Sequence, residues 1–263
     1  MMGQFCRQMQ FFLKKMAEGI ELSIVIPNFN SGILLDHTLK SIFSKETSLL
    51  FEVLIMDNLS RDNPLVYINK YPKDAINFFS SEDSGIYDAM NKGIGLASGT
   101  WLMFLGAGDK LLLDQINIAV QSENSEFDLV YGNVIVSKSN KLYDGSFNLM
   151  KLLYKNISHQ AIIYKSSVFN KIGMYDLHYK IWADYLMNLE IFFNKKMNKK
   201  YLELVFCTFQ GEGISDQKKD FRFSNRKKYI YLKLLMKYLS WSNFCVVCVY
   251  FFNLFITKLK SAK

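Results

Sequence analysis

The chain has 263 residues and a formal net charge of +8, with 50% hydrophobic and 15% aromatic residues. This composition excludes a disordered chain and leaves apolar material for an interface or a membrane contact beyond the core. The length fits one α/β domain with an appendage. The basic runs at 194–200 and 225–229 lack nucleic-acid-binding motifs. We therefore expect anionic phosphate or lipid partners, or a solvated basic surface, and no nucleic acid.

The cysteines and the N-terminus indicate the compartment. Four cysteines form no disulfide framework, and the stretch MQFFLKKM is too short and too basic for a cleavable signal sequence. We therefore expect a cytoplasmic protein with reduced thiols. Cys245 and Cys248 form a CxxC pair without a second ligand pair, which indicates packing and not zinc.

The chain opens with a strand, a helix and a second strand. ELSIVIPNFN (21–30) is β-branched and apolar for the length of one buried strand, and Pro27 together with Asn28 and Asn30 is expected to stop it. ILLDHTLKSIF (33–43) has helical spacing. FEVLIMDN (51–58) predicts a second buried strand that ends on Asp57.

The same order then repeats. AINFFSSED (75–83) predicts a third strand, and WLMFLG (101–106) predicts a fourth. Between them, residues 85–98 predict a helix with one apolar side formed by Ile86, Met90 and Ile94. A βαβα order predicts a parallel sheet with helices on both faces.

Polar side chains follow the ends of these strands, where ligands of α/β sheets bind. The residues in question are Asn28, Asn30, Asp57, Glu82, Asp83 and Asp109. So many carboxylates on one edge repel one another unless a cation or sugar hydroxyls join them. Each of Asp57 and Asp109 has an alternative role as the cap of a following helix, for Asp109 one that begins near Lys110.

Several motifs in the right order resemble family 2 glycosyltransferases of the GT-A fold. They are SIVIPNFN, IMDNLSRD, SEDSGIYDAMNKGIGLASGTWLMFLGAGD, DLVYGNV, SHQAIIYKSSVFNKIGMYD and IWADYLMNLEI. The resemblance covers residues 21–215 and is strongest to the subgroup that makes bacterial surface polysaccharides, such as colanic acid, O-antigen or capsule. It implies a mixed, mainly parallel sheet flanked by helices.

The resemblance also implies a domain organisation. The GT-A domain would span residues 21–217, with a nucleotide-binding half at 21–110 and an acceptor and catalytic half at 111–217. An N-terminal extension at 1–20 and a basic, hydrophobic helical tail at 218–263 would flank this domain.

The same resemblance assigns site residues. Nucleotide binding is expected of Pro27, Asn28, Asn30, Asp57, Asn58, Asp83, Tyr87, Asn91 and Lys92. Contact with the donor sugar or the acceptor is expected of Gly108, Tyr131, Asn133, His159, Gln160 and Trp182. The loop GEGIS (211–215) resembles a mobile loop that closes over the donor.

Asp109 is expected to bind Mn²⁺ or Mg²⁺ together with the donor's diphosphate. The family's Asp-x-Asp pattern is reduced here to Gly106-Ala107-Gly108-Asp109, so only the last acid remains. A hard cation keeps waters and takes oxygens from substrate phosphates, so one carboxylate can suffice. Affinity for the metal should then be weak without nucleotide.

Asp184, in WADY, matches the family's catalytic base, which takes the proton of the acceptor hydroxyl in inverting transfer. From the residues alone, a helix N-cap is the first interpretation of Asp184. Trp182 and Tyr185 could contact sugar rings or pack in the core. A lone histidine such as His159 is more often structural.

The tail has a basic amphipathic segment at 221–237 and an uncharged run at 238–257, about as long as a membrane span. Polar residues interrupt the run, and Trp241 and three lysines mark its ends. We expect first a helix on the anionic inner face of the cell membrane, second a packed or homodimer-forming helix, and third a full span. The contribution of the uncharged run to catalysis should be small.

These observations together predict an inverting, metal-dependent glycosyltransferase. It would move a sugar from a nucleotide-diphosphate sugar to a polyprenyl-lipid-linked saccharide in surface polysaccharide biosynthesis. One alternative is a transferase acting directly on polyprenyl phosphate. The other is a non-catalytic nucleotide-sugar-binding module, which the reduced acidic loop suggests.

Overall fold

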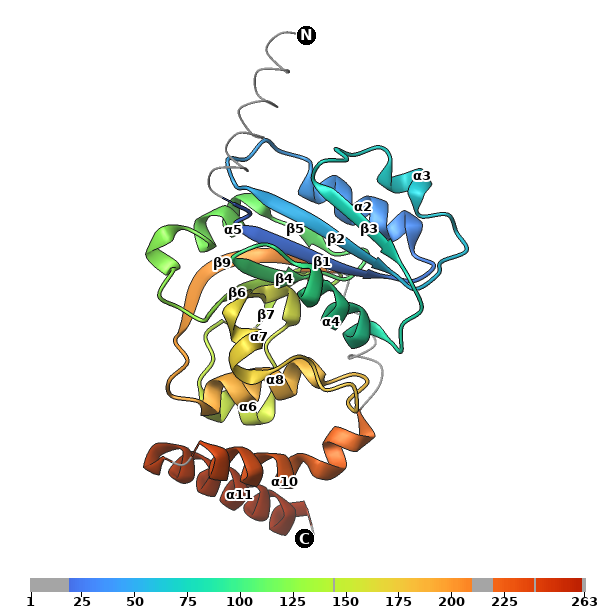
Figure 1. Ribbon diagram of the computed structural model, residues 1–263. Helices are drawn as coiled ribbons and strands as arrows, with labels where there is room; N and C mark the ends of the chain where they lie inside the picture. The colour runs from blue at the N-terminus through green and yellow to red at the C-terminus, as the bar shows by residue number, and fades with distance from the viewer. Residues whose placement is uncertain (1–18, 144, 210–219, 239, 262–263) are drawn as a thin grey trace.

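The computed structural model describes residues 19–143, 145–209, 220–238 and 240–261. Most of the N-terminal extension and the GEGIS loop lie outside these residues. The described chain forms one mixed sheet with helices on its faces, and two C-terminal helices pack at one end of the molecule (Figure 1).

The first part of the sheet has the predicted parallel order. Its elements are β1 (Leu22–Asn28), α2 (Gly32–Ile42), β2 (Phe51–Asp57), α3 (Leu65–Ile68), β3 (Ile76–Ser80), α4 (Ile86–Leu96) and β4 (Trp101–Phe104). The strands lie in the order β3-β2-β1-β4, all parallel. Strands β1, β2 and β4 are buried over almost their whole length, as expected where helices cover both faces.

The second part makes the sheet mixed. Its elements are β5 (Lys110–Leu111), α5 (Leu113–Ala119), η1 (Ser122–Asn124), β6 (Leu129–Val136), β7 (Lys141–Tyr143), α6 (Leu149–Tyr154), η2 (His159–Ala161), β8 (Ile162–Lys165), α7 (Ser167–Ile172), α8 (Ala183–Phe193) and β9 (Lys199–Phe209). Strand β8 is antiparallel to both β4 and β6, whereas β6 and β9 are parallel. The sheet therefore continues as β4-β8-β6-β9-β5, with β7 beside β6.

The first strand ends in the predicted segment, with Pro27 still inside β1 and Asn28 as its last residue. The carbonyl of Val25 accepts from Leu105 on the β4 side, and that of Asn28 accepts from Asn58 on the β2 side. Alternation along the strand therefore turns Pro27 toward β4, whose last residue is Phe104. The missing N–H of Pro27 costs no ladder bond there.

Two helices, α10 (Phe221–Lys237) and α11 (Trp241–Ser261), form the C-terminal part. Helix α10 packs on α8, and α11 packs on α6 and α10 (Figure 1). Among the described residues, no helix has both the length and the apolar character that crossing a membrane requires.

Helix α4 buries only part of the predicted apolar side. Met90 is buried and Ile94 is partly buried against the core, whereas Ile86 is exposed and the other buried residues are Tyr87, Ala89 and Gly93. The reason is the close approach of α4 to β1 at a glycine. A Cβ atom on Gly93 would lie 2.4 Å from Val25 Cγ1, and Val25 is fully buried in β1.

Substitution of this glycine tests the packing. Gly93→Ala should lower the free energy of unfolding by about 1–3 kcal/mol, because the stiff Val25 side chain has no free space to move into. Gly95→Ala is the matched control, since a Cβ there meets nothing within 4 Å. That variant should gain up to about 1 kcal/mol from helix propensity. Equal effects of the two variants in urea unfolding would contradict the packing.

Candidate active site

The first polar cluster lies at the carboxyl ends of β1, β2 and β3, as predicted. Asn28 Nδ2 donates to Asp57 Oδ1 at 2.7 Å. Asp57 Oδ2 accepts from Ser80 Oγ at 2.7 Å and from the N–H of Ser60 at 3.0 Å. The next helix, α3, begins only at Leu65 with Pro64 as its N-cap. The interpretation of Asp57 as a helix cap is therefore wrong.

Asp57 is held in its ionised form. Burial alone would raise the pKa of Asp57, but hydrogen bonds from Ser60, Ser80 and Asn28 outweigh it and the pKa is lowered. Asn28 is buried, and its Oδ1 has no hydrogen-bond partner among the described residues. A carboxylate beside an unpaired amide oxygen offers acceptors only, which suits the N–H or O–H groups of a base or a ribose.

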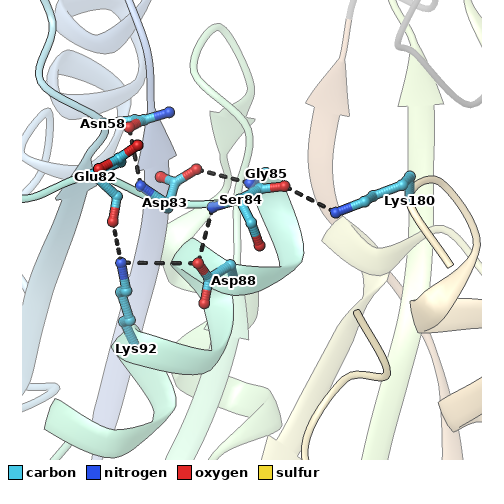
Figure 2. Close-up of polar contacts among 8 residues, drawn as sticks. All are labelled: Asn58, Glu82, Asp83, Ser84, Gly85, Asp88, Lys92 and Lys180. Carbon is cyan, nitrogen blue, oxygen red and sulfur yellow. Dashed lines mark hydrogen bonds and ion pairs between the residues drawn. The ribbon is translucent and has the colours of Figure 1, made fainter. Parts of the chain in front are cut away.

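The loops around this cluster hold one another through their backbone. Asn30 Oδ1 accepts from the N–H of Arg61 at 2.9 Å, and Asn58 Oδ1 accepts from the N–H of Asp83 at 3.0 Å. Asp83 Oδ1 in turn accepts from the N–H of Gly85 at 2.9 Å (Figure 2). Hydrogen bonds thus connect the loops that carry the polar residues predicted at the ends of the first three strands.

Two lysines fix the loop that precedes α4 (Figure 2). Lys92 donates to the carbonyl of Glu82 and lies 3.8 Å from Asp88. Lys180, from the second half of the chain, donates to the carbonyl of Ser84 at 3.1 Å. Lys92 was expected to bind nucleotide, and the structure places its ammonium group on this loop.

Asp109 ends the turn that follows β4. Its Oδ2 accepts from the N–H of Gly106 at 2.7 Å, and its own N–H donates to the carbonyl of Gly106 at 3.1 Å. A Cβ atom on residue 106 would lie 3.1 Å from Asp109 Oδ2, so glycine permits this close contact. The residue after Asp109 begins strand β5, and α5 starts only at Leu113. The expected helix near Lys110, with Asp109 as its cap, is therefore wrong.

Gly108, between these residues, has a φ of +102°, a conformation that L side chains rarely adopt. Its N–H donates to Thr38 Oγ1 in α2 at 2.9 Å. The turn is therefore fastened to the helix on the other side of the site.

The environment of Asp109 fits a cation that is shared with a substrate. Burial raises the pKa of Asp109, against the charge of His159, the N–H of Gly106 and the Gln160 side chain. Over the described ranges, no three His, Cys, Asp or Glu side chains come together as a metal site. A hard divalent cation beside one carboxylate would take its other ligands from a diphosphate and from water.

Asp184 lies in the first turn of α8 and is buried. Its Oδ2 accepts from Asn156 Nδ2 at 2.8 Å, and its Oδ1 lies 2.7 Å from the hydroxyl of Tyr87. Trp182 is the N-cap of α8, so the cap interpretation of Asp184 is wrong. Burial raises the pKa of Asp184, and the charge of His159 opposes this.

His159 connects the two acids electrostatically. Its charge lowers the pKa of both Asp109 and Asp184. Its Nε2 is buried without a hydrogen-bond partner among the described residues. An unpaired ring nitrogen beside two acids is what a bound ligand would satisfy. The neighbouring Gln160 is also buried, in η2.

Tyr131 and Asn133, expected near the donor sugar, are engaged by the fold. The hydroxyl of Tyr131 accepts from the N–H of Phe147 at 2.9 Å and donates to its carbonyl at 3.2 Å. Asn133 Oδ1 accepts from the N–H of Gly145 at 3.0 Å, and its Nδ2 donates to the hydroxyl of Tyr201 at 2.9 Å. Both side chains fasten the segment after β7 onto β6.

Asn91 and Trp182 are engaged in the same way. Asn91 donates to the carbonyl of Tyr175 at 2.9 Å and accepts from its N–H at 3.0 Å. Trp182 packs edge-on against Phe223 of α10, with ring centroids 5.4 Å apart. These contacts hold α4 and the start of α8 in place, and the expected ligand contacts of both residues stay predictions.

Sequence reasoning missed several residues of the site. These are Ser60, Ser80, Asn156, Tyr164 and Asn188. Ser60 and Ser80 have a local signal, because Ser60 follows β2, which ends on the expected contact Asp57, and Ser80 is the last residue of β3. Asn156 has none, because it comes from a loop before η2 and reaches Asp184 only in the folded chain.

Comparison with solved structures defines the class of fold. Staphylococcus aureus TarS 1–349 in complex with UDP-GlcNAc matches 82% of this chain and 67% of its own with a TM-score of 0.68 at 16% identity. A Pyrobaculum calidifontis mannosyltransferase in complex with GDP-Man and Mn²⁺ matches with a TM-score of 0.57 at 12% identity, over 82% of this chain and 63% of its own. The fold is therefore that of GT-A glycosyltransferases.

Sequence comparison gives the family. The profile of glycosyl transferase family 2 matches residues 23–209, so the chain belongs to this family. A Mycobacterium bovis PGL/p-HBAD biosynthesis glycosyltransferase is 37% identical over 212 residues, 78% of this chain and 82% of the relative. A Campylobacter jejuni GalNAc(5)-diNAcBac-PP-undecaprenol beta-1,3-glucosyltransferase is 29% identical over 126 residues, 46% of this chain and 40% of the relative.

Proposed function

We propose that the protein is an inverting glycosyltransferase that uses a nucleotide-diphosphate sugar in surface polysaccharide biosynthesis. The observation that carries the proposal is the pair of buried acids, Asp109 and Asp184. The charge of His159 lowers the pKa of both acids. The pair adjoins an edge of the sheet where Asp57 offers acceptors to a nucleotide. Membership of a family of glycosyltransferases supports the same reaction class.

Each acid has a distinct task in this mechanism. Asp57 and Asn28 accept hydrogen bonds from the base or the ribose of the donor. Asp109 would hold Mn²⁺ or Mg²⁺, which neutralises charge on the leaving diphosphate when it is bound. Asp184 takes the proton of the acceptor hydroxyl as that oxygen attacks the anomeric carbon from the face opposite the diphosphate.

The proposed acceptor is a saccharide linked to a polyprenyl lipid. A relative whose name includes PP-undecaprenol supports this class. A transferase acting directly on polyprenyl phosphate is the alternative within enzymes, and a preference for the bare lipid phosphate would select it. A non-catalytic module is the alternative outside enzymes, and absence of both sugar transfer and donor hydrolysis with Mn²⁺ would select that.

Asp184→Asn tests the assignment of the base. The variant keeps shape and hydrogen bonding but cannot accept a proton, so turnover should fall by about 10²-fold or more. Donor affinity should not change, because the nucleotide contacts lie on other elements. Thermal shifts with UDP-, GDP- and dTDP-sugars identify the donor first, since a ligand at 100 times its Kd stabilises by about 2.7 kcal/mol. Undiminished turnover would move the base elsewhere.

Asp109→Asn tests the metal assignment. Donor affinity, measured by calorimetry with and without Mn²⁺, should lose its dependence on the metal, because the amide is a poorer ligand for a hard cation. Asp57→Asn is the comparison variant, and it should weaken donor binding under both conditions. Retained Mn²⁺ dependence in Asp109→Asn would show that Asp109 does not bind the cation.

The proposed place of action is the anionic inner face of the cell membrane, reached through α11. One side of this helix packs inward through Asn243, Val247 and Tyr250. The other side exposes Trp241, Phe244, Val249, Phe252 and Phe255. Neighbouring α10 adds the exposed basic residues Arg222, Arg226, Lys228 and Lys233. An apolar face beside basic residues suits the surface of an anionic bilayer.

Phe252 and Phe255 are the residues to change, because they are 63% and 60% exposed. The double variant Phe252→Ser/Phe255→Ser should bind anionic vesicles at least about tenfold more weakly in a flotation assay, since two buried aromatic contacts are lost. Leu142→Ser, at a 56% exposed position in β7, should bind like the unchanged protein. Unchanged vesicle binding together with loss of a dimer would assign the face to a second copy.

A further inference from the structure

The hydroxyl of Tyr87 lies between two acceptors. It is 2.5 Å from the carbonyl oxygen of Ile181 and 2.7 Å from Asp184 Oδ1. A tyrosine hydroxyl carries one hydrogen, and it can accept as well as donate. If Asp184 were ionised, that hydrogen could satisfy only one of the two oxygens. One buried oxygen would then face the hydroxyl without a hydrogen between them, which is costly.

A proton on Asp184 Oδ1 removes this conflict. Asp184 then donates to the oxygen of Tyr87, and Tyr87 donates to the carbonyl of Ile181. Every oxygen in the row has a partner, and no charge is buried. Tyr87 itself stays neutral, because burial raises the pKa of its hydroxyl well above the usual range.

The other oxygen of Asp184 is already engaged as an acceptor. Asn156 Nδ2 donates to Oδ2 at 2.8 Å, and Asn156 Oδ1 accepts from Asn188 Nδ2 at 2.9 Å. Asn188 Oδ1 accepts from the hydroxyl of Tyr164 at 2.8 Å. With both amides in this direction, Oδ2 is an acceptor. The proton of Asp184 is then on Oδ1, the oxygen that faces Tyr87.

We propose that Asp184 rests as the neutral acid, its proton held on Oδ1 by the row Asp184–Tyr87–Ile181, and that Tyr87 is the positioning residue for this state. The role of Asp184 as base rests on the function proposed above. Removal of the proton to water must then precede sugar transfer. Transfer returns a proton from the acceptor hydroxyl to Asp184, so each turnover ends in the resting form and requires a new release.

The groups that face Asp184 agree with this state. The titratable side chains that influence its charge are His159 of η2, Tyr87 of α4, Tyr164 of β8, and Tyr175 and Tyr185. All four tyrosines have a raised pKa, chiefly through burial, and remain neutral. Within this set, only His159 can carry a positive charge. Burial raises the pKa of Asp184 against this charge, and it would do so even against a hydrogen bond donated by Tyr87.

Infrared spectroscopy tests the proposal without relying on activity. A protonated carboxyl group has a carbonyl stretching band that is separate from the carboxylate bands. The spectrum of the unchanged protein minus that of Asp184→Asn, both at pH 7, should contain this band. The spectrum of Asp109→Asn minus that of Asp184→Asn should contain it as well, because Asp184 is present in the first of these two variants. Absence of the band at pH 7 would overturn the proposal.

Tyr87→Phe tests the positioning role by the sign of a shift. Tyr87 accepts from the neutral acid, so its removal should move the midpoint of the Asp184 band down by about one pH unit or more. A hydroxyl that instead donated to a carboxylate would give an upward shift on removal. Tyr175→Phe is the control, and its midpoint should move less than that of Tyr87→Phe, because no hydrogen bond joins the buried Tyr175 hydroxyl to Asp184. An upward shift or none in Tyr87→Phe overturns the positioning role.

The rate profile separates this inference from the proposed function. If Asp184 is also the base, kcat/KM rises with pH through the midpoint of the infrared band. In Tyr87→Phe, the midpoint of the band and the midpoint of the kcat/KM profile should then move to lower pH together. A band that titrates while kcat/KM does not follow it confirms the protonated state and removes Asp184 as the base. Sugar transfer by a protein without the band would overturn the protonated resting state and leave the proposed function standing.

Discussion

The buried carboxyl group of Asp184 is the contact on which the arrangement of the site depends. It lies on α8 and meets Tyr87 of α4 and Asn156 of the loop before η2, so three distant segments converge on one group. Because a buried polar group must keep its partners, none of these segments can shift alone without leaving one unsatisfied. Helix α4, helix α8 and the loop before η2 are positioned relative to one another by this requirement.

The C-terminal helices extend the same constraint. Asp220 caps α10 by accepting from the N–H of Phe223 at 2.9 Å, and its other oxygen accepts from the N–H of Ile181 at 3.1 Å. Phe223 is fully buried and stacks on Tyr185 beside Asp184, with centroids 5.0 Å apart. Helix α10 therefore supports the segment that precedes Asp184.

The sequence predicted those features that depend on neighbours along the chain. The alternation of buried runs and helical stretches gives the parallel strands β1 to β4, and parallel strands place Asn28, Asp57 and Asp109 at one edge. Features decided by distant partners were not predictable. Tyr87 matched a nucleotide-binding motif, yet its hydroxyl contacts α8, because only the fold brings residues 87 and 184 together. The uncharged run of the tail did not indicate which side of α11 would be buried against α6 and α10.

Crowding of carboxylates at the edge of the sheet is resolved by two different physical means. Asp57 keeps its charge because neutral donors from three segments satisfy it, so no cation is required there. Asp109 and Asp184 have a raised pKa because burial disfavours their charged forms. A diphosphate and its cation would change the balance for Asp109, since a bound cation favours the carboxylate. The reduced acidic loop is consistent with this order of events, in which the donor brings the cation to a site that is stable without it.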